Sequence, residues 1–158
     1  MFDKLSRRWE FFREMQALLK QAEVEARLAG SRMVEAEHLL TAMAAVPFGP
    51  ASRALGRLGL SRDRIAGAIE RERCGALALA GVQTAGMPAM RPFTGGRSLR
   101  WNQSARLAAD RSCHEAPDDP RLRMLLGIVH AEAGVMPRLL TELDVSREDI
   151  EQAVRTAS

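Results

Sequence analysis

The second half of the sequence repeats the pattern of the first half at a fixed distance. The segment RALGRLGLSRDRIAGAIE at 53–70 aligns with RLLTELDVSREDIEQAVR at 138–155, an offset of 85 residues. Apolar, serine and arginine positions coincide in this alignment. The same register places Leu40 on Leu125 across the intervening turn. Two copies of one structural unit explain the coincidence better than chance, so the chain is expected to fold as two similar halves.

Each copy is predicted to be helical. Between residues 5 and 28 the apolar residues recur three and four positions apart, which is the pattern of an amphipathic helix. No stretch shows sustained alternation of apolar and polar residues, so no strand is required and the predicted fold class is all-α. The other predicted helices cover 35–46, 51–59, 62–72, 98–113, a segment that begins after Pro120, 137–143, and a last one capped by Ser146.

A four-helix unit of this size buries its apolar stripe poorly by itself. We therefore predict two tandem four-helix repeats packed as one pseudo-twofold helical bundle, forming a single domain over residues 1–158. Repeat one covers about 5–73 and repeat two about 98–157. The glycine- and proline-containing stretch at about 74–97 is predicted to connect them.

Composition narrows the classes of partner. The formal net charge is only +3, aromatic residues make up 4% of the chain and tyrosine is absent. Proteins that bind nucleic acid usually carry a basic stripe with interleaved aromatic residues, so no nucleic-acid partner is predicted. Because no apolar run is long enough to span a bilayer, no membrane partner is predicted either.

The two cysteines and the N-terminus bear on location. Cys74 and Cys113 are far apart and form no CxxC pair, so neither a zinc site nor a disulfide framework is indicated. The first fifteen residues are charged throughout and lack the apolar run and cleavage site of a signal peptide. A reducing cytoplasm is the expected location.

No catalytic motif is evident. His114 and His130 stand near acidic residues, but neither fits HExxH, and no GxSxG elbow occurs. The phosphate-binding pattern G-x-x-x-x-G-K-[ST] is also absent. We therefore predict that the protein is not an enzyme and uses no catalytic residue, cofactor or metal; a hydrolase depending on His38 is the enzymatic alternative.

Several short segments resemble a known family. The chain runs from an Ala- and Glu-rich helix into EAEHLL at 35–40, and a short helix ends in LGLSRDRI. Together with the doubling, this resembles the N-terminal (Clp repeat) domain of ClpA- and ClpC-type AAA+ chaperones, here without the ATPase modules. In that family the second repeat typically opens with an aromatic residue followed by Thr-Pro-Arg-Ala, for which this chain offers Phe93 and Thr94.

The resemblance implies candidate ligand-binding residues. Glu37 corresponds to a family glutamate in a pocket for phosphorylated arginine, and its counterpart in the second repeat is Leu122, which accepts no hydrogen bond. The alternative is that Glu37 is only a first-turn helix charge. Phe2 and Phe93 are candidates for an apolar groove that binds adaptors, peptides or cyclic peptide antibiotics.

The neighbouring residues are expected to be structural. Phe11 and Phe12 could contribute to the same groove, but we favour a place in the core for both. His38 is expected to be a packed histidine whose ring nitrogen bonds a nearby turn.

The predicted function is a non-enzymatic protein- and peptide-binding module that recognises substrates, adaptors or peptide-like ligands and modulates Clp-dependent proteolysis. Its expected partners are protein substrates, adaptors or Clp protease components, with phosphoarginine and cyclic peptides as candidate ligands. The alternative is a degenerate scaffold or decoy that acts by self-association or by sequestering ligands of Clp N-terminal domains.

Overall fold

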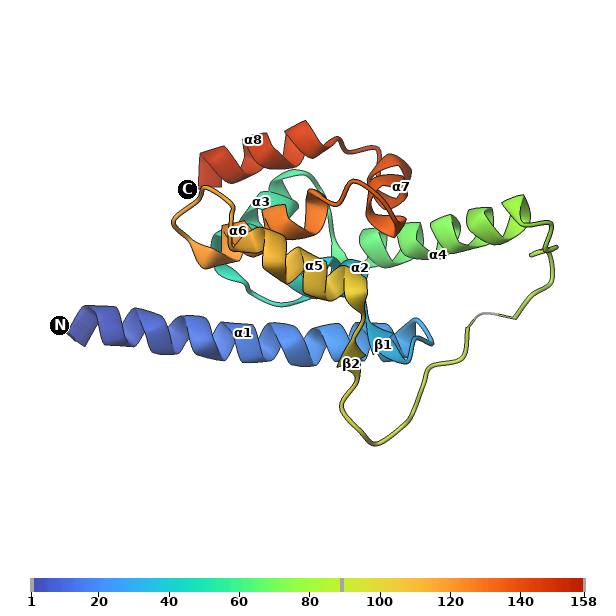
Figure 1. The fold of residues 1–158 in the computed structure, drawn as a ribbon, viewed down its shortest axis with the longest axis horizontal. Coiled ribbons are helices and arrows are strands. Elements are labelled where there is room, and N and C mark those ends of the chain that lie inside the picture. The colour runs from blue at the N-terminus through green and yellow to red at the C-terminus, as the bar shows by residue number, and fades with distance from the viewer. Residues whose placement is uncertain (1, 89, 158) are drawn as a thin grey trace.

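The computed structural model describes residues 2–88 and 90–157 (Figure 1). For residues 2–5, 7 and 8 it describes the backbone alone. Nearly all of its regular structure is helical, as predicted. The first repeat contains α1 (Phe2–Leu28), β1 (Met33–Val34), α2 (Ala36–Ala45), α3 (Gly49–Arg57) and α4 (Arg62–Leu79). The second contains β2 (Arg100–Trp101), α5 (Gln103–Ser112), α6 (Pro120–Val129), α7 (Val135–Glu142) and α8 (Arg147–Ala157).

The repeat seen in the sequence is confirmed by the helix starts. Helices α4 and α8 both begin one residue after a serine, at the predicted offset. The Ser61 hydroxyl accepts a hydrogen bond from the Arg64 amide at 3.2 Å. Ser146 and Asp149 form a reciprocal capping box, with amide-to-side-chain distances of 2.8 and 3.1 Å.

Helices of the first repeat pack against helices of the second across the interface between them. Helix α3 of the first repeat packs against α8 of the second, and α4 packs against α7 in the same way. Within each repeat the first helix packs on the second, α1 on α2 and α5 on α6, while α2 and α6 also touch each other. Leu39, Leu40, Leu125 and Ile128 on these central helices are fully buried. The arrangement is the predicted pseudo-twofold bundle.

One glycine allows the close packing of α5 on α6. A Cβ atom at Gly127, in the last turn of α6, would lie 2.4 Å from the Ala108 carbonyl oxygen of α5. Any larger residue would push the two helices apart, so this contact depends on glycine.

The structure differs from the prediction in several local features. The two short strands pair in parallel, with Met33 beside Arg100 and Val34 beside Trp101. Two residues are too few to show an alternating pattern, so such strands cannot be recognised from periodicity. Helix α4 ends at Leu79, seven residues beyond the predicted end, because its last turns are rich in Ala and Leu, which favour helix.

The predicted starts of α5 and α7 also differ from those in the structure. Helix α5 begins at Gln103, where the Asn102 side chain caps it by accepting a hydrogen bond from the Ala105 amide at 3.1 Å. Helix α7 begins at Val135, so Pro137 lies within its first turn rather than opening it. Proline has no amide hydrogen to lose in that turn.

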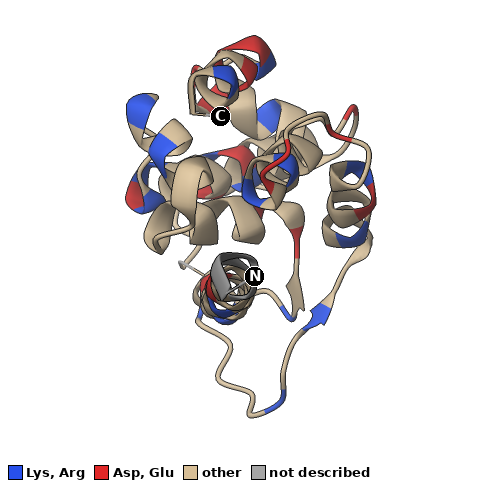
Figure 2. Ribbon diagram, turned by 90° about the vertical axis from the view of Figure 1, so that its left-hand side faces the viewer, with Lys and Arg blue, Asp and Glu red and all other residues tan. Residues whose placement is uncertain are grey.

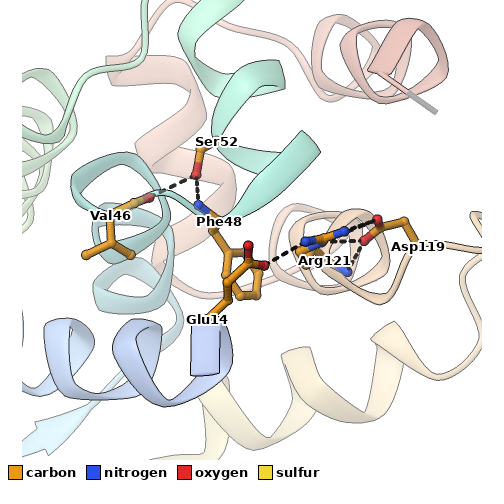
Figure 3. Close-up of polar contacts among 6 residues, drawn as sticks. All are labelled: Glu14, Val46, Phe48, Ser52, Asp119 and Arg121. Atoms are coloured by element: carbon orange, nitrogen blue, oxygen red, sulfur yellow. Dashed lines mark hydrogen bonds and ion pairs between the residues drawn. The ribbon is translucent and has the colours of Figure 1, made fainter. Parts of the chain in front are cut away.

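The PFGP turn between α2 and α3 is held by the side chain of Ser52 on α3 (Figure 3). The amide of the fully buried Phe48 donates to the Ser52 hydroxyl at 2.7 Å, and that hydroxyl lies 3.0 Å from the Val46 carbonyl oxygen. Gly49 has a φ of 56°, and a Cβ there would lie 2.7 Å from the Arg121 guanidinium. Glycine is therefore favoured in this turn.

Arg121 ties the second repeat to the first. Its guanidinium bonds Glu14 of α1 at 2.6 Å and Asp119, the cap of α6, at 2.7 Å (Figure 3). These carboxylates raise the pKa of Arg121, and the same hydrogen bond and charge lower the pKa of Asp119 against the opposing effect of its burial. The ion pairs orient α6 relative to α1.

The first turns of α1 extend beyond the bundle (Figure 1). Trp9 is 66% and Phe12 54% exposed, and their rings meet edge to face at 6.3 Å. The expectation that Phe12 lies in the core is therefore wrong, because little else of the domain reaches this part of the helix. Phe11 is partly buried against the core, as favoured.

Candidate functional site

A cavity of about 220 Å³ lies where the two repeats meet. The start of α2, the helix α5 and the loop that leads into α7 form its walls. Both repeats therefore contribute to one site. Its lining residues are Glu35, Ala36, Glu37, Asn102, Ser104, Leu107, Arg111, Ala131, Ala133, Gly134, Val135 and Met136.

Hydrogen bonds fix the start of α2 against the start of α5. The Asn102 side-chain amide donates to the Glu35 carboxylate at 3.0 Å. The Ala36 backbone amide donates to the Ser104 hydroxyl, also at 3.0 Å. The first turn of α2 is therefore held rigidly at the cavity.

Glu37 lies on this first turn and is only 5% exposed. Burial, followed by the hydrogen bond and negative charge of neighbouring Glu35, raises the pKa of Glu37 from its ordinary 4.5 to about 8. At neutral pH the protonated Glu37 carboxyl donates to the Glu35 carboxylate. A cation entering the cavity would favour the ionised form of Glu37 and so displace its proton.

His38 behaves as the packed histidine expected. It is 3% exposed, and its Nδ1 accepts a hydrogen bond from the Glu35 amide at 3.0 Å. Burial lowers the pKa of His38, which keeps the ring neutral and able to accept this bond. In the second repeat Leu122, the counterpart of Glu37, is fully buried and takes part only in core packing.

The structure does not bring Glu37 and Phe93 together. Phe93 is half-buried in another cavity, of about 480 Å³, which is bordered by β1, β2 and the connector. The side chain of Phe2 lies outside the described residues. Of the two candidate residues whose side chains are described, Glu37 lines the cavity between the repeats and Phe93 does not.

Sequence reasoning missed two features of the second repeat. Trp101, not Phe93, is the aromatic residue directly before the cap of its first helix. Arg111 lines the Glu37 cavity, and its Nε donates to the Gly127 carbonyl oxygen at 2.8 Å. The signal was present in the sequence. Asparagine is a favoured helix cap, so Asn102 indicates a helix start, and Trp101 is the aromatic residue directly before it.

The fold and the cavity define an all-helical domain of two tandem repeats with an acidic site between them. Residues 10–78 match the model of the Clp repeat (R) N-terminal domain, in agreement with the resemblance found in the sequence of the first repeat. Domains of this family bind protein substrates and adaptors. A comparison with curated proteins gave no match.

None of the helices in 2–88 and 90–157 is long and apolar enough to cross a membrane. Over the same residues, no group of three or more His, Cys, Asp or Glu side chains is arranged to hold a metal ion.

Proposed function

We propose that this domain is a non-enzymatic module that binds protein substrates, adaptors or peptide-like ligands and so modulates Clp-dependent proteolysis. The observation that carries the proposal is the pair of neighbouring carboxyl groups, the half-buried Glu35 and the buried Glu37, in the wall of a cavity between the repeats. The match of residues 10–78 to the Clp repeat model supports the same class of function.

The chemistry of the cavity suits a guanidinium group. A planar guanidinium offers parallel N–H donors that match carboxylate oxygens. Leu107 and Met136 provide apolar wall for an aliphatic stem. Arg111 lines the same cavity, and the terminal nitrogens of its guanidinium have no hydrogen-bond acceptor among the described residues. An arginine that also carries a phosphoryl group would therefore meet both a negative and a positive partner.

The raised pKa of Glu37 makes such binding depend on pH. A cation favours the ionised pair, so binding at neutral pH releases a proton. With a pKa of about 8, affinity should rise about tenfold for each pH unit between 6 and 8 and level off above that. An acid with an ordinary pKa would be ionised throughout this range and give no such slope.

Calorimetric and thermal-shift titrations with free phosphoarginine and with arginine test the proposal. Wild type is compared with Glu37→Gln, which keeps a hydrogen bond to Glu35 but cannot ionise. Glu148→Gln is the matched control, because Glu148 is an exposed first-turn acid of α8. Saturable binding to wild type and to the control, lost in Glu37→Gln, supports the site; equal binding by all three proteins contradicts it.

A second candidate function is self-association as a scaffold or decoy. The exposed Trp9 and Phe12 on the protruding part of α1 favour it, since neighbouring exposed aromatic residues often mark interaction surfaces. Ultracentrifugation over a range of concentrations distinguishes the candidates. A mass that rises with concentration and falls in Trp9→Ser/Phe12→Ser supports self-association, and a constant monomer mass excludes it.

A further inference from the structure

The cavity that contains Phe93, about 480 Å³, lies between the loop after α1, the two short strands and the connector. Its lining combines three arginines with apolar side chains and contains no acidic residue. Ser98 and two glycines complete it. The arginines are Arg32, Arg97 and Arg100, and the apolar residues are Met33, Phe93 and Leu99.

The connector is fixed on α1 at this point. The Arg27 guanidinium donates to the Arg97 carbonyl oxygen at 2.5 Å, and the Phe93 amide donates to the Arg27 carbonyl oxygen at 2.8 Å. The Glu23 carboxylate accepts from the Leu99 amide at 3.2 Å. The cavity wall is therefore anchored by side chains of the bundle.

Glycines let the chain approach closely here. Gly30 has a φ of 73°, and a Cβ at that position would lie 3.0 Å from the Arg91 carbonyl oxygen. A Cβ at Gly95 would lie 2.3 Å from the Phe93 ring. The ring fits against the connector only because Gly95 has no side chain.

The connector supplies no acidic side chain to balance the positive charge of the cavity. The sequence contains no Asp or Glu between Glu72 and Asp110, and Figure 2 shows basic but no acidic positions along the connector and β2. Arg97 and Arg100 are exposed and form no ion pair with the described residues. The acid that anchors the connector, Glu23, is already bound to Arg27 at 2.7 Å. A positive potential is therefore concentrated at the cavity.

We propose that this cavity binds an acidic segment of a protein partner. Carboxylates of the segment pair with Arg32, Arg97 and Arg100, and an interspersed apolar side chain packs on Leu99 and the edge of Phe93. Arginine is well suited to this role because its guanidinium binds carboxylate through two parallel hydrogen bonds. The cavity thus selects a charge opposite to that selected by the Glu37 cavity.

The Phe93 ring argues for a peptide rather than a nucleic acid. Arg27 and Arg32 each place their guanidinium carbon 5.6 Å from the ring centroid. Single-stranded nucleic acid gains much of its affinity by stacking bases on free aromatic faces. A ring that already holds two guanidinium groups does not provide a free face.

Fluorescence anisotropy with labelled probes tests the proposal. The probes are a glutamate-rich peptide with interspersed leucines, the same peptide with glutamine at each glutamate, and a single-stranded oligonucleotide of equal formal charge. The variant Arg97→Gln/Arg100→Gln is compared with the control Arg53→Gln/Arg57→Gln, which removes equal charge from exposed positions on α3. Phe93→Leu tests the apolar contact, and circular dichroism checks that each variant is folded.

The expected result is saturable binding of the glutamate peptide alone, weakened about tenfold at low salt by the cavity variant and about twofold or less by the control. Phe93→Leu should also weaken it, whereas Glu37→Gln should not, which separates this site from the function proposed above. Absence of peptide binding, equal losses in both double variants, or oligonucleotide binding of equal strength would each overturn the proposal.

Discussion

Replacing Glu37 with glutamine should change how the stability of the domain depends on pH. In the folded protein the pKa of Glu37 is raised to about 8, whereas in the unfolded chain it returns to about 4.5. Between these values the folded state binds more protons than the unfolded state. The free energy of unfolding contributed by this group therefore falls as pH rises through that window, and it stays constant above pH 8.

The magnitude follows from the two pKa values. From pH 5.5 to 8.5 the group lowers the free energy of unfolding of the wild type by about 3 kcal/mol. Glutamine cannot ionise, so Glu37→Gln should lack this loss. At pH 5.5 the amide still donates to Glu35, and the two proteins should agree within about 1 kcal/mol.

Urea unfolding at a series of pH values from 5.5 to 8.5, followed by circular dichroism, measures the difference. Wild type and Glu37→Gln should diverge by about 3 kcal/mol across the series, with the variant the more stable at high pH. Glu148→Gln, which alters an exposed acid, should follow the wild type. Parallel curves for Glu37→Gln and wild type would refute the argument that this carboxyl is protonated in the folded state at neutral pH.

Three glycine substitutions probe the packing by urea unfolding at constant pH. Gly49→Ala should cost about 2 kcal/mol, because it combines a positive φ with a Cβ close to Arg121; wild-type stability would contradict the explanation of this turn. Gly127→Ala should cost about 2 kcal/mol or more, since its Cβ would meet the Ala108 carbonyl oxygen, and a smaller loss would mean that α5 can move away freely. Gly75→Ala, on an exposed part of α4 with nothing within 4 Å, should instead stabilise the domain by about 0.5–1 kcal/mol.

The helical repeat could be predicted because its signals are local. Apolar spacing reports a helix, and the serines before α4 and α8 report where the helix begins. The strands could not be predicted, because β1 and β2 are two residues long and exist only where the folded chain brings them together. The exposure of Phe12 was missed for a related reason: periodicity indicates which face of a helix is apolar, but not where the rest of the protein ends.

Single residues of the site could be predicted from the sequence, but their arrangement around the cavity could not. Glu37 was recognised by its motif, whereas the raised pKa arises from its burial and from Glu35. The placement of α5 against α2 depends on Asn102 and Ser104, which are distant in sequence. Phe93 was assigned to the entry of the second repeat because its neighbours resembled a motif, but the helix cap that defines the entry lies nine residues later, at Asn102.

Helices of each repeat pack against helices of the other. We therefore expect that the connector is not needed to hold the two halves together. The α3–α8 and α4–α7 contacts cover apolar surface of both halves. The covalent link therefore serves mainly to keep the local concentration of the two halves high. A chain cleaved between Leu79 and Phe93 should remain associated at high protein concentration and come apart on dilution. The domain is in this sense an intramolecular dimer, and its two halves are candidates for reconstitution from separate fragments.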